Sequence, residues 1–121
     1  KSFMPLIKVH YPTELKPGTL HSLSSSLTEL TAEALGKSSD FVMTVFQKTE
    51  LQSFGLDIDS PSLFIEVKNV GPLPTETTNT LSLKISELCS ELIKVQSSRI
   101  YIDFQESPRH LWGWNGKTFL K

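Results

Sequence analysis

Cysteine is nearly absent from the sequence, which has only Cys89, and its three histidines lie far apart. A single cysteine excludes an intramolecular disulfide and a cysteine-based zinc site, and the histidines show no ligand spacing. We therefore expect no metal and no cofactor. Net charge is also low, because 12 basic and 13 acidic residues leave a formal charge of -1. Nucleic-acid binders normally carry a basic stripe, so this balance argues against a nucleic-acid partner.

Long apolar runs are absent as well. No stretch approaches the ~18 apolar residues that cross a bilayer, and none resembles a signal-peptide core, so we expect no membrane partner. Apolar residues make up 38% of the 121 residues, below the usual range of about 45–50%, which also counts glycine. We predict a single domain over residues 5–121, preceded by an N-terminal extension or expression remnant over residues 1–4. A core this thin favours further burial between subunits.

Two stretches place apolar residues at helical spacing and predict amphipathic helices. Pro17-Gly18 indicates a turn before the first stretch. Thr19 is expected to be the N-cap of this helix, and Gly36 is expected to end it. The Thr75–Thr80 run is expected to cap the second. The apolar stripes comprise Leu20, Leu23, Leu27, Leu30 and Ala34 in the first helix, and Leu81, Ile85, Leu88 and Leu92 in the second.

Four short segments rich in β-branched and aromatic residues predict strands. They are residues 6–9, 41–46, 63–67 and 100–104. The order is β-α-β, a loop over about 47–61, and β-α-β again. Each unit needs a crossover that makes its two strands parallel. We therefore predict an α+β sandwich: a duplicated β-α-β unit with a four-stranded mixed sheet and both helices on one face.

The other face of this sheet has no predicted cover. Phe41, Met43 and Val45 alternate with Val42, Thr44 and Phe46, and the 63–67 strand is apolar on both faces apart from Glu66. Both strands are therefore expected to expose apolar surface. Covering several hundred Å² would contribute several kcal/mol at about 25 cal/mol per Å². This pattern favours self-association.

The C-terminal segment is rich in aromatic residues. Both tryptophans and a phenylalanine lie between Trp112 and Phe119. Asn115-Gly116 predicts a two-residue hairpin turn between them. The aromatic residues either pin this hairpin, or line an apolar pocket, or reach a neighbouring subunit.

Several short segments occur in a fixed order between Pro5 and Phe119. They are Met4-Pro5-Leu6-Ile7, Leu35-Gly36-Lys37, Asp40-Phe41-Val42-Met43, Ser53-Phe54-Gly55, Val70-Gly71, Arg99-Ile100-Tyr101-Ile102, Gly113-Trp114-Asn115-Gly116 and Thr118-Phe119. Each piece alone recurs by chance. As an ordered set they resemble the macrophage migration inhibitory factor (MIF) family of the tautomerase superfamily, whose fold is the duplicated β-α-β unit.

The resemblance implies a homotrimer around a central channel, and keto–enol tautomerisation of phenylpyruvate-like or dopachrome-like compounds. The substrate is then a small aromatic 2-keto acid or its enol. The family's proton carrier is an N-terminal proline, which corresponds to Pro5 once Met4 and anything upstream are removed. A free α-amino group has a pKa of about 7.7–8.0, and an apolar pocket and a nearby cation lower it. The neutral amine is then a general acid and base.

The resemblance also implies a set of substrate contacts. Lys37 would bind the substrate carboxylate or stabilise the enolate oxygen. Without the resemblance, Lys37 would be interpreted as a solvated lysine beyond a helix C-terminus. Val70 matches a position whose backbone amide contacts substrate. Tyr101 matches an aromatic residue contributed by a neighbouring subunit, although alone it reads as a buried strand tyrosine. The implied apolar rim comprises Trp112, Trp114 and Phe119.

Two substitutions depart from the family pattern inside this region. Asp103, also placed among the substrate-binding residues, stands where the animal cytokine has asparagine. A carboxylate there opposes an anionic substrate and raises the pKa of a neighbouring amine. The animal protein's Cys-x-x-Cys motif corresponds to Ser62 and Ile65, so we expect no thiol–disulfide activity.

A third departure concerns the residues before Pro5. While Lys1-Ser2-Phe3 and Met4 are attached, the Pro5 nitrogen is an amide without a basic lone pair. We expect Met4 to be the native initiator and Lys1-Ser2-Phe3 a remnant. The extended chain is therefore expected to have strongly reduced tautomerase activity.

Two other functions are compatible with parts of the sequence. The first is a cytokine-like signalling or binding protein with a vestigial or blocked pocket and a cell-surface receptor; we expect a cytoplasmic protein, or one secreted without a signal peptide. No Asn-x-Ser/Thr sequon is present. The second is an RNA-recognition module, which shares the β-α-β duplication. It is disfavoured because the sequence has no Lys/Arg-Gly-aromatic strand motif.

Overall fold

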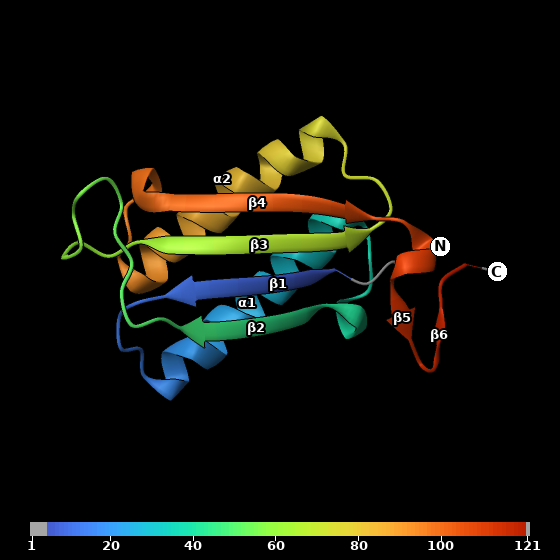
Figure 1. Cartoon of the computed structure of the whole chain (residues 1–121), viewed down its shortest axis with the longest axis horizontal. Helices are drawn as coiled ribbons and strands as arrows, with labels where there is room; N and C mark the ends of the chain where they lie inside the picture. The colour runs from blue at the N-terminus through green and yellow to red at the C-terminus, as the bar shows by residue number, and fades with distance from the viewer. Residues whose placement is uncertain (1–4, 121) are drawn as a thin grey trace.

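A computed structural model describes residues 5–120, which form two β-α-β units and a C-terminal hairpin (Figure 1). The extension predicted over residues 1–4 lies outside the described residues. Three short 3₁₀ turns cover Ser39–Phe41, Ser97–Arg99 and Arg109–Leu111. The helices and strands are β1 (Leu6–Tyr11), α1 (Pro17–Leu35), β2 (Met43–Lys48), β3 (Leu63–Val70), α2 (Thr75–Ile93), β4 (Ile100–Ser107), β5 (Gly113–Trp114) and β6 (Lys117–Thr118).

The four long strands form one sheet in the order β2-β1-β3-β4. The pairs β1–β2 and β3–β4 are parallel, and β1–β3 is antiparallel. Both helices cover the same face (Figure 1), so the predicted mixed sheet is confirmed. This topology places the starts of β1 and β2 beside the ends of β3 and β4. We call this end of the sheet the Pro5 end. The loop over residues 49–62 lies at the opposite end, which we call the loop end.

The core lies between the sheet and the two helices. Cys89 of α2 is fully buried there, and burial raises the pKa of its thiol to about 12. Thiolate chemistry at Cys89 is therefore suppressed at neutral pH. The buried cluster consists of Ile7, Val9 and Tyr11 on β1, Leu23 and Leu27 on α1, Leu63, Ile65 and Val67 on β3, Leu81, Ile85 and Cys89 on α2, and Val95 and Ile100 before and at the start of β4.

The helix starts differ from the predictions. The first helix begins at Pro17, two residues before the predicted N-cap Thr19, because proline already has a helical φ angle and suits the first turn. The second helix has Pro74 as its N-cap, and no hydroxyl of the Thr75–Thr80 run caps it. Both cap predictions are therefore wrong. The end of α1 at Gly36 is confirmed, with a left-handed φ of 65°.

The open face of the sheet is more charged than the sequence pattern indicated. The Nε2 atom of His10 lies 2.7 Å from Oε2 of Glu66, and Lys68 Nζ lies 3.8 Å from Glu66 Oε1. The hydrogen bond with His10 is the main cause of the lowered pKa of Glu66. Lys8 and Asp103 flank Glu66 in the strand register. Met43 and Phe64 on this face are 62% and 38% exposed, so the predicted exposed apolar residues are confirmed, but charged side chains from β1, β3 and β4 lie among them.

Candidate functional site

A cavity of about 300 Å³ opens at the Pro5 end of the sheet. Pro5 is fully buried in its wall. The Pro5 carbonyl accepts a hydrogen bond of 3.1 Å from the Met43 backbone N–H, which ties the start of β1 to the start of β2. This bond fixes the proline where two strands begin. The residues that line the cavity are Pro5, Leu6, Asp40, Phe41, Val42, Met43, Trp112, Gly113 and Trp114.

Aromatic rings from the C-terminal segment and from the turn before β2 line this cavity. Phe41 and Trp114 meet edge to face, with ring centroids 5.8 Å apart. Trp114 also stacks on Phe119 at 6.3 Å with nearly parallel planes. Asn115 and Gly116 have φ angles of 56° and 85°, which confirms the predicted turn. Trp114 therefore both packs on the hairpin and lines the cavity, Trp112 lines the cavity, and Phe119 supports Trp114 from outside the lining.

Two more predicted site residues lie at the Pro5 end without lining the cavity. Lys37 follows the Gly36 cap of α1, and its backbone N–H donates to the Ala32 carbonyl at 2.9 Å. Val70 ends β3 and is fully buried, immediately before Gly71, whose φ is 103°. Pro5 and both tryptophans therefore line one cavity, and Lys37 and Val70 lie at the same Pro5 end of the sheet.

Tyr101 and Asp103 lie away from this cavity, on the open face of β4. Tyr101 pairs with Phe64, which pairs with His10, so it is level with His10. Five residues of β1 separate that level from Pro5, or about 17 Å of strand. Tyr101 is 66% exposed, so its reading as a buried strand tyrosine is wrong. A single chain does not bring Tyr101 to the Pro5 cavity.

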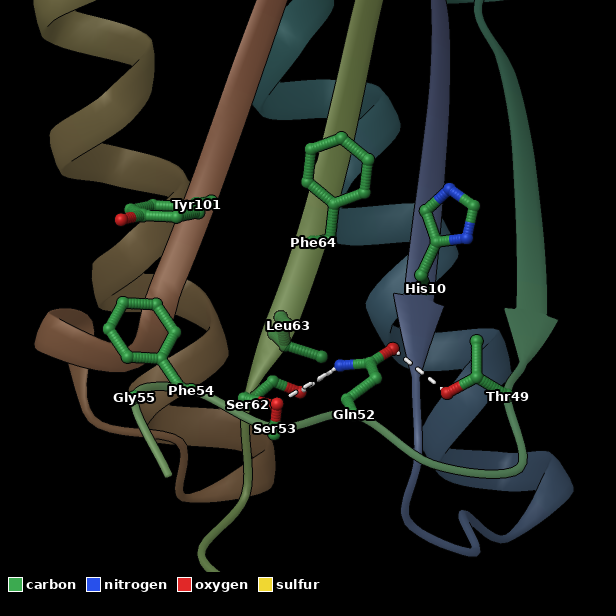
Figure 2. Close-up of a pocket in the computed structure, with 10 residues that line it drawn as sticks. All are labelled: His10, Thr49, Gln52, Ser53, Phe54, Gly55, Ser62, Leu63, Phe64 and Tyr101. Atoms are coloured by element: carbon green, nitrogen blue, oxygen red, sulfur yellow. Dashed lines mark hydrogen bonds between the residues drawn. The ribbon is translucent and has the colours of Figure 1, made fainter. Parts of the chain in front are cut away.

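A second cavity of about 380 Å³ lies at the loop end. Figure 2 shows the residues around it, with the helices behind the sheet. Phe54 packs against Tyr101 with ring centroids 4.9 Å apart. Gln52 donates from Nε2 to the carbonyl of Ser62 at 3.2 Å and to its hydroxyl at 3.1 Å, and accepts from Thr49 at 2.9 Å. Sequence reasoning missed this cavity, because it forms only when the loop folds back onto β4.

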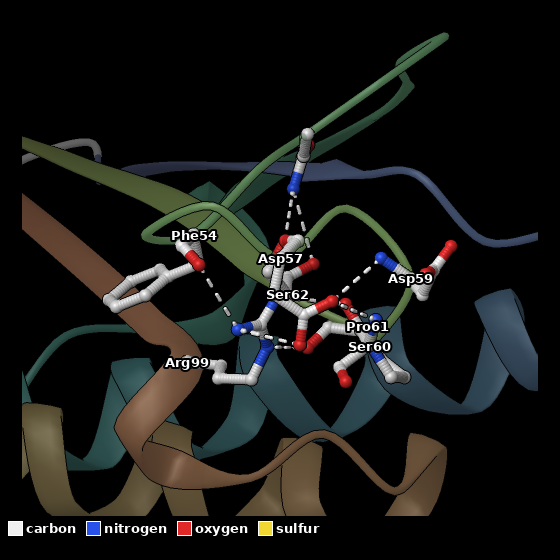
Figure 3. Close-up of polar contacts among 8 residues, drawn as sticks. Phe54, Asp57, Asp59, Ser60, Pro61, Ser62 and Arg99 are labelled. Carbon is white, nitrogen blue, oxygen red and sulfur yellow. Dashed lines mark hydrogen bonds and ion pairs between the residues drawn. The ribbon is translucent and has the colours of Figure 1, made fainter.

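Arg99 holds that loop in place (Figure 3). Its guanidinium group donates to the carbonyl oxygens of Pro61, Asp57 and Ser60 at 2.9, 3.1 and 3.0 Å. It also lies 3.6 Å from an Asp57 carboxylate oxygen and 5.4 Å from the centre of the Phe54 ring. One mostly buried cation therefore fixes the position of the loop beside Tyr101.

Acid is expected to loosen this loop through Asp57. Hydrogen bonds from the Ser60 hydroxyl and backbone, then from the Asp59 backbone, lower the Asp57 pKa to about 2 from 3.8. Because the pKa of Asp57 is lower in the folded chain than in the unfolded chain, its ionised carboxylate stabilises the fold. This stabilisation is complete above pH 4 and is lost as the pH falls towards 2. The melting temperature of the Asp57→Asn variant should therefore fall less between pH 5 and pH 2.5 than that of the unchanged protein. Equal falls would contradict this role.

Within residues 5–120, the structure has no group of three or more His, Cys, Asp or Glu side chains placed to hold a metal ion. None of the helices in this part of the chain is long and apolar enough to cross a membrane.

Comparison with known proteins identifies the family to which the chain belongs. The family model described as macrophage migration inhibitory factor (MIF) matches residues 4–120. Macrophage migration inhibitory factor from Xenopus tropicalis is 26% identical over 98 residues, covering 81% of this chain and 84% of the relative. A solved homologue from Prochlorococcus marinus is 32% identical with a TM-score of 0.88, covering 95% of this chain and 99% of that one.

A more distant solved structure has the same fold. It is described as an "R7 fused 4-OT wild type asymmetric trimer" and is 18% identical, with a TM-score of 0.83 over 94% of this chain and 95% of that one. The duplicated β-α-β unit, the ordered sequence segments and the match from residue 4 to residue 120 therefore agree: this chain belongs to the MIF family, with the tautomerase-superfamily fold.

Proposed function

We propose that this protein catalyses keto–enol tautomerisation of small aromatic carbonyl compounds of the phenylpyruvate and dopachrome type. The observation that carries the proposal is the position of Pro5, which is fully buried in the wall of an aromatic cavity. Membership of the MIF family supports the same reaction class.

The proposed chemistry needs a neutral amine at Pro5. An N-terminal amine has an ordinary pKa of about 7.7–8.0, and the apolar wall disfavours its charged form, so its pKa is expected to lie lower. The neutral nitrogen takes a proton from the carbon beside the substrate carbonyl and returns one to the enol. Phe41, Trp112 and Trp114 enclose the substrate ring. Lys37 and the Val70 backbone amide are proposed to hold the carboxylate or the enolate oxygen, and Phe119 to support the rim.

The complete site is proposed to need a second copy of the chain. Tyr101 and Asp103 lie on the open face of β4, about 17 Å and about 10 Å along the strand direction from the level of Pro5. In the described residues β2 and β4 are the outer strands of the sheet, so each has an edge available for another subunit. A homotrimer with cyclic symmetry would place Tyr101 of each copy at the Pro5 cavity of the next.

The state of the Pro5 nitrogen tests this function. The helices and strands of the described residues lie between Leu6 and Thr118, so a chain beginning at Pro5 keeps each of them. We expect that chain to form enol from phenylpyruvate, and the chain with residues 1–4 attached to do so at least about 100-fold more slowly, because an amide nitrogen is not a base. Equal rates would show that Pro5 is not the proton carrier. Ultraviolet absorbance of the enol gives the rates.

A further inference from the structure

Phe54 is held in place by the backbone of its own loop and by Arg99. The backbone N–H groups of Phe54 and Asp57 each donate to the carbonyl of the other, at 3.0 and 3.2 Å, around a turn in which Gly55 has a left-handed φ of 65°. Arg99 donates from Nη1 to the same Phe54 carbonyl at 3.4 Å, and its guanidinium group lies 5.4 Å from the centre of the Phe54 ring (Figure 3). The Phe54 ring therefore has a fixed place beside the start of β4.

The Tyr101 ring, in contrast, is mostly exposed on the open face of the sheet. An exposed side chain samples several χ1 positions unless its neighbours exclude some of them. The half-buried Phe54 meets the Tyr101 ring at 4.9 Å between centroids, with the two planes tilted by 55° (Figure 2). The next residue across the register is Phe64, which stacks on His10 at 5.2 Å. The contact with Phe54 therefore limits the directions in which the Tyr101 ring can point.

We infer that Phe54 is a positioning residue for the shared site: it holds the Tyr101 ring in the direction that meets a ligand in the Pro5 cavity of the next copy. The inference deepens the proposed function and rests on it for the shared site. Phe54 is not among the described residues that line the Pro5 cavity of its own chain, so it acts through Tyr101. Arg99 supports this role, because it fixes the loop that carries Phe54.

Binding can be measured separately from catalysis, because both tryptophans of the chain line the Pro5 cavity. Their fluorescence reports a titration with hydrocinnamate, which has the ring and carboxylate of phenylpyruvate but no ketone. In the chain beginning at Pro5, Phe54→Ala should weaken hydrocinnamate binding by about 3- to 10-fold, the contribution of one aromatic pair. KM for phenylpyruvate should rise by the same factor, while kcat changes less than about twofold because the proton carrier is untouched.

Two further variants of the loop serve as rescue and control. Phe54→Tyr keeps the ring, and should bind hydrocinnamate within about twofold of the unchanged protein. Leu56→Ala is the matched control, because it removes a large apolar side chain from the same loop and Leu56 is fully exposed. It should also leave the affinity within about twofold.

A double-mutant cycle with Tyr101→Ala separates positioning from a direct or purely structural role. When Tyr101 is already alanine, Phe54→Ala should change the affinity by less than about twofold. Phe54→Leu removes the ring but keeps apolar contact with the loop, and should give the same pattern in this cycle.

Unchanged affinity in Phe54→Ala, an equal loss with and without Tyr101, or no quenching by hydrocinnamate in the unchanged protein would overturn the inference. Turnover separates this inference from the proposed function. Turnover of phenylpyruvate without coupling between Phe54 and Tyr101 contradicts only the positioning role, whereas coupled binding without turnover contradicts only the reaction.

Discussion

Pro5→Gly, in the chain that begins at residue 5, is expected to lower kcat/KM for phenylpyruvate by about 10²- to 10⁴-fold, the range that a positioned general base contributes. Glycine keeps an N-terminal amine but lacks the ring that is buried in the cavity wall. Without the ring the nitrogen rotates freely, and water reaches it more easily. Both changes reduce the fraction of amines that are neutral and correctly directed.

Pro74→Gly is the matched control for this variant. Pro74 is exposed and is the N-cap of α2, a position that glycine also fills well. We expect activity within about twofold of the unchanged protein. Far-ultraviolet circular dichroism should be the same for all three proteins. A folded Pro5→Gly variant with nearly full activity would show that another group moves the proton.

Tyr101→Ala is expected to lower kcat/KM by about 10- to 100-fold, the loss that follows when a substrate is no longer held in place. The reason is its proposed position over the Pro5 cavity of the next subunit. Within its own chain Tyr101 contacts Phe54, with ring centroids 4.9 Å apart, and lies near the loop end of the sheet, away from Pro5. A purely local role would therefore leave turnover unchanged.

Tyr101→Phe separates the two roles of this side chain. It keeps the ring that packs on Phe54 and removes only the hydroxyl. If the ring positions substrate, Tyr101→Phe should retain most of the activity, and the loss in Tyr101→Ala should appear mainly in KM. Full activity of a folded, trimeric Tyr101→Ala variant would contradict a shared site.

Patterns that depend on near neighbours in the chain predicted most of the fold. The stripes around Leu27 and Ile85 follow helical spacing, and both residues are fully buried in the core. Asn115-Gly116 needs only its own two φ angles to make the hairpin turn. Helix starts were less predictable, because the actual N-caps, Lys16 and Pro74, form no side-chain capping hydrogen bond, whereas hydroxyl residues nearby suggested one.

Features that depend on distant residues could not be predicted. The charged open face arises because Lys8, Glu66 and Asp103 are opposite one another in the register, which alternation along one strand does not reveal. The contacts of Arg99 with the loop join residues about forty positions apart and follow no local motif. Among the candidate site residues, family resemblance supplied Pro5 and Tyr101, and the roles of both stay predictions.

The central claim, a site shared between Pro5 of one copy and Tyr101 of the next, is tested most directly by mixing two variants that each have low activity alone. Pro5→Gly and Tyr101→Ala subunits would be unfolded together, refolded and assayed with phenylpyruvate. In a random trimer, about one site in four combines an intact Pro5 with an intact Tyr101 from its neighbour. We predict recovery of about a quarter of the unchanged activity. A mixture no more active than the mean of the two variants alone would contradict the shared proline site.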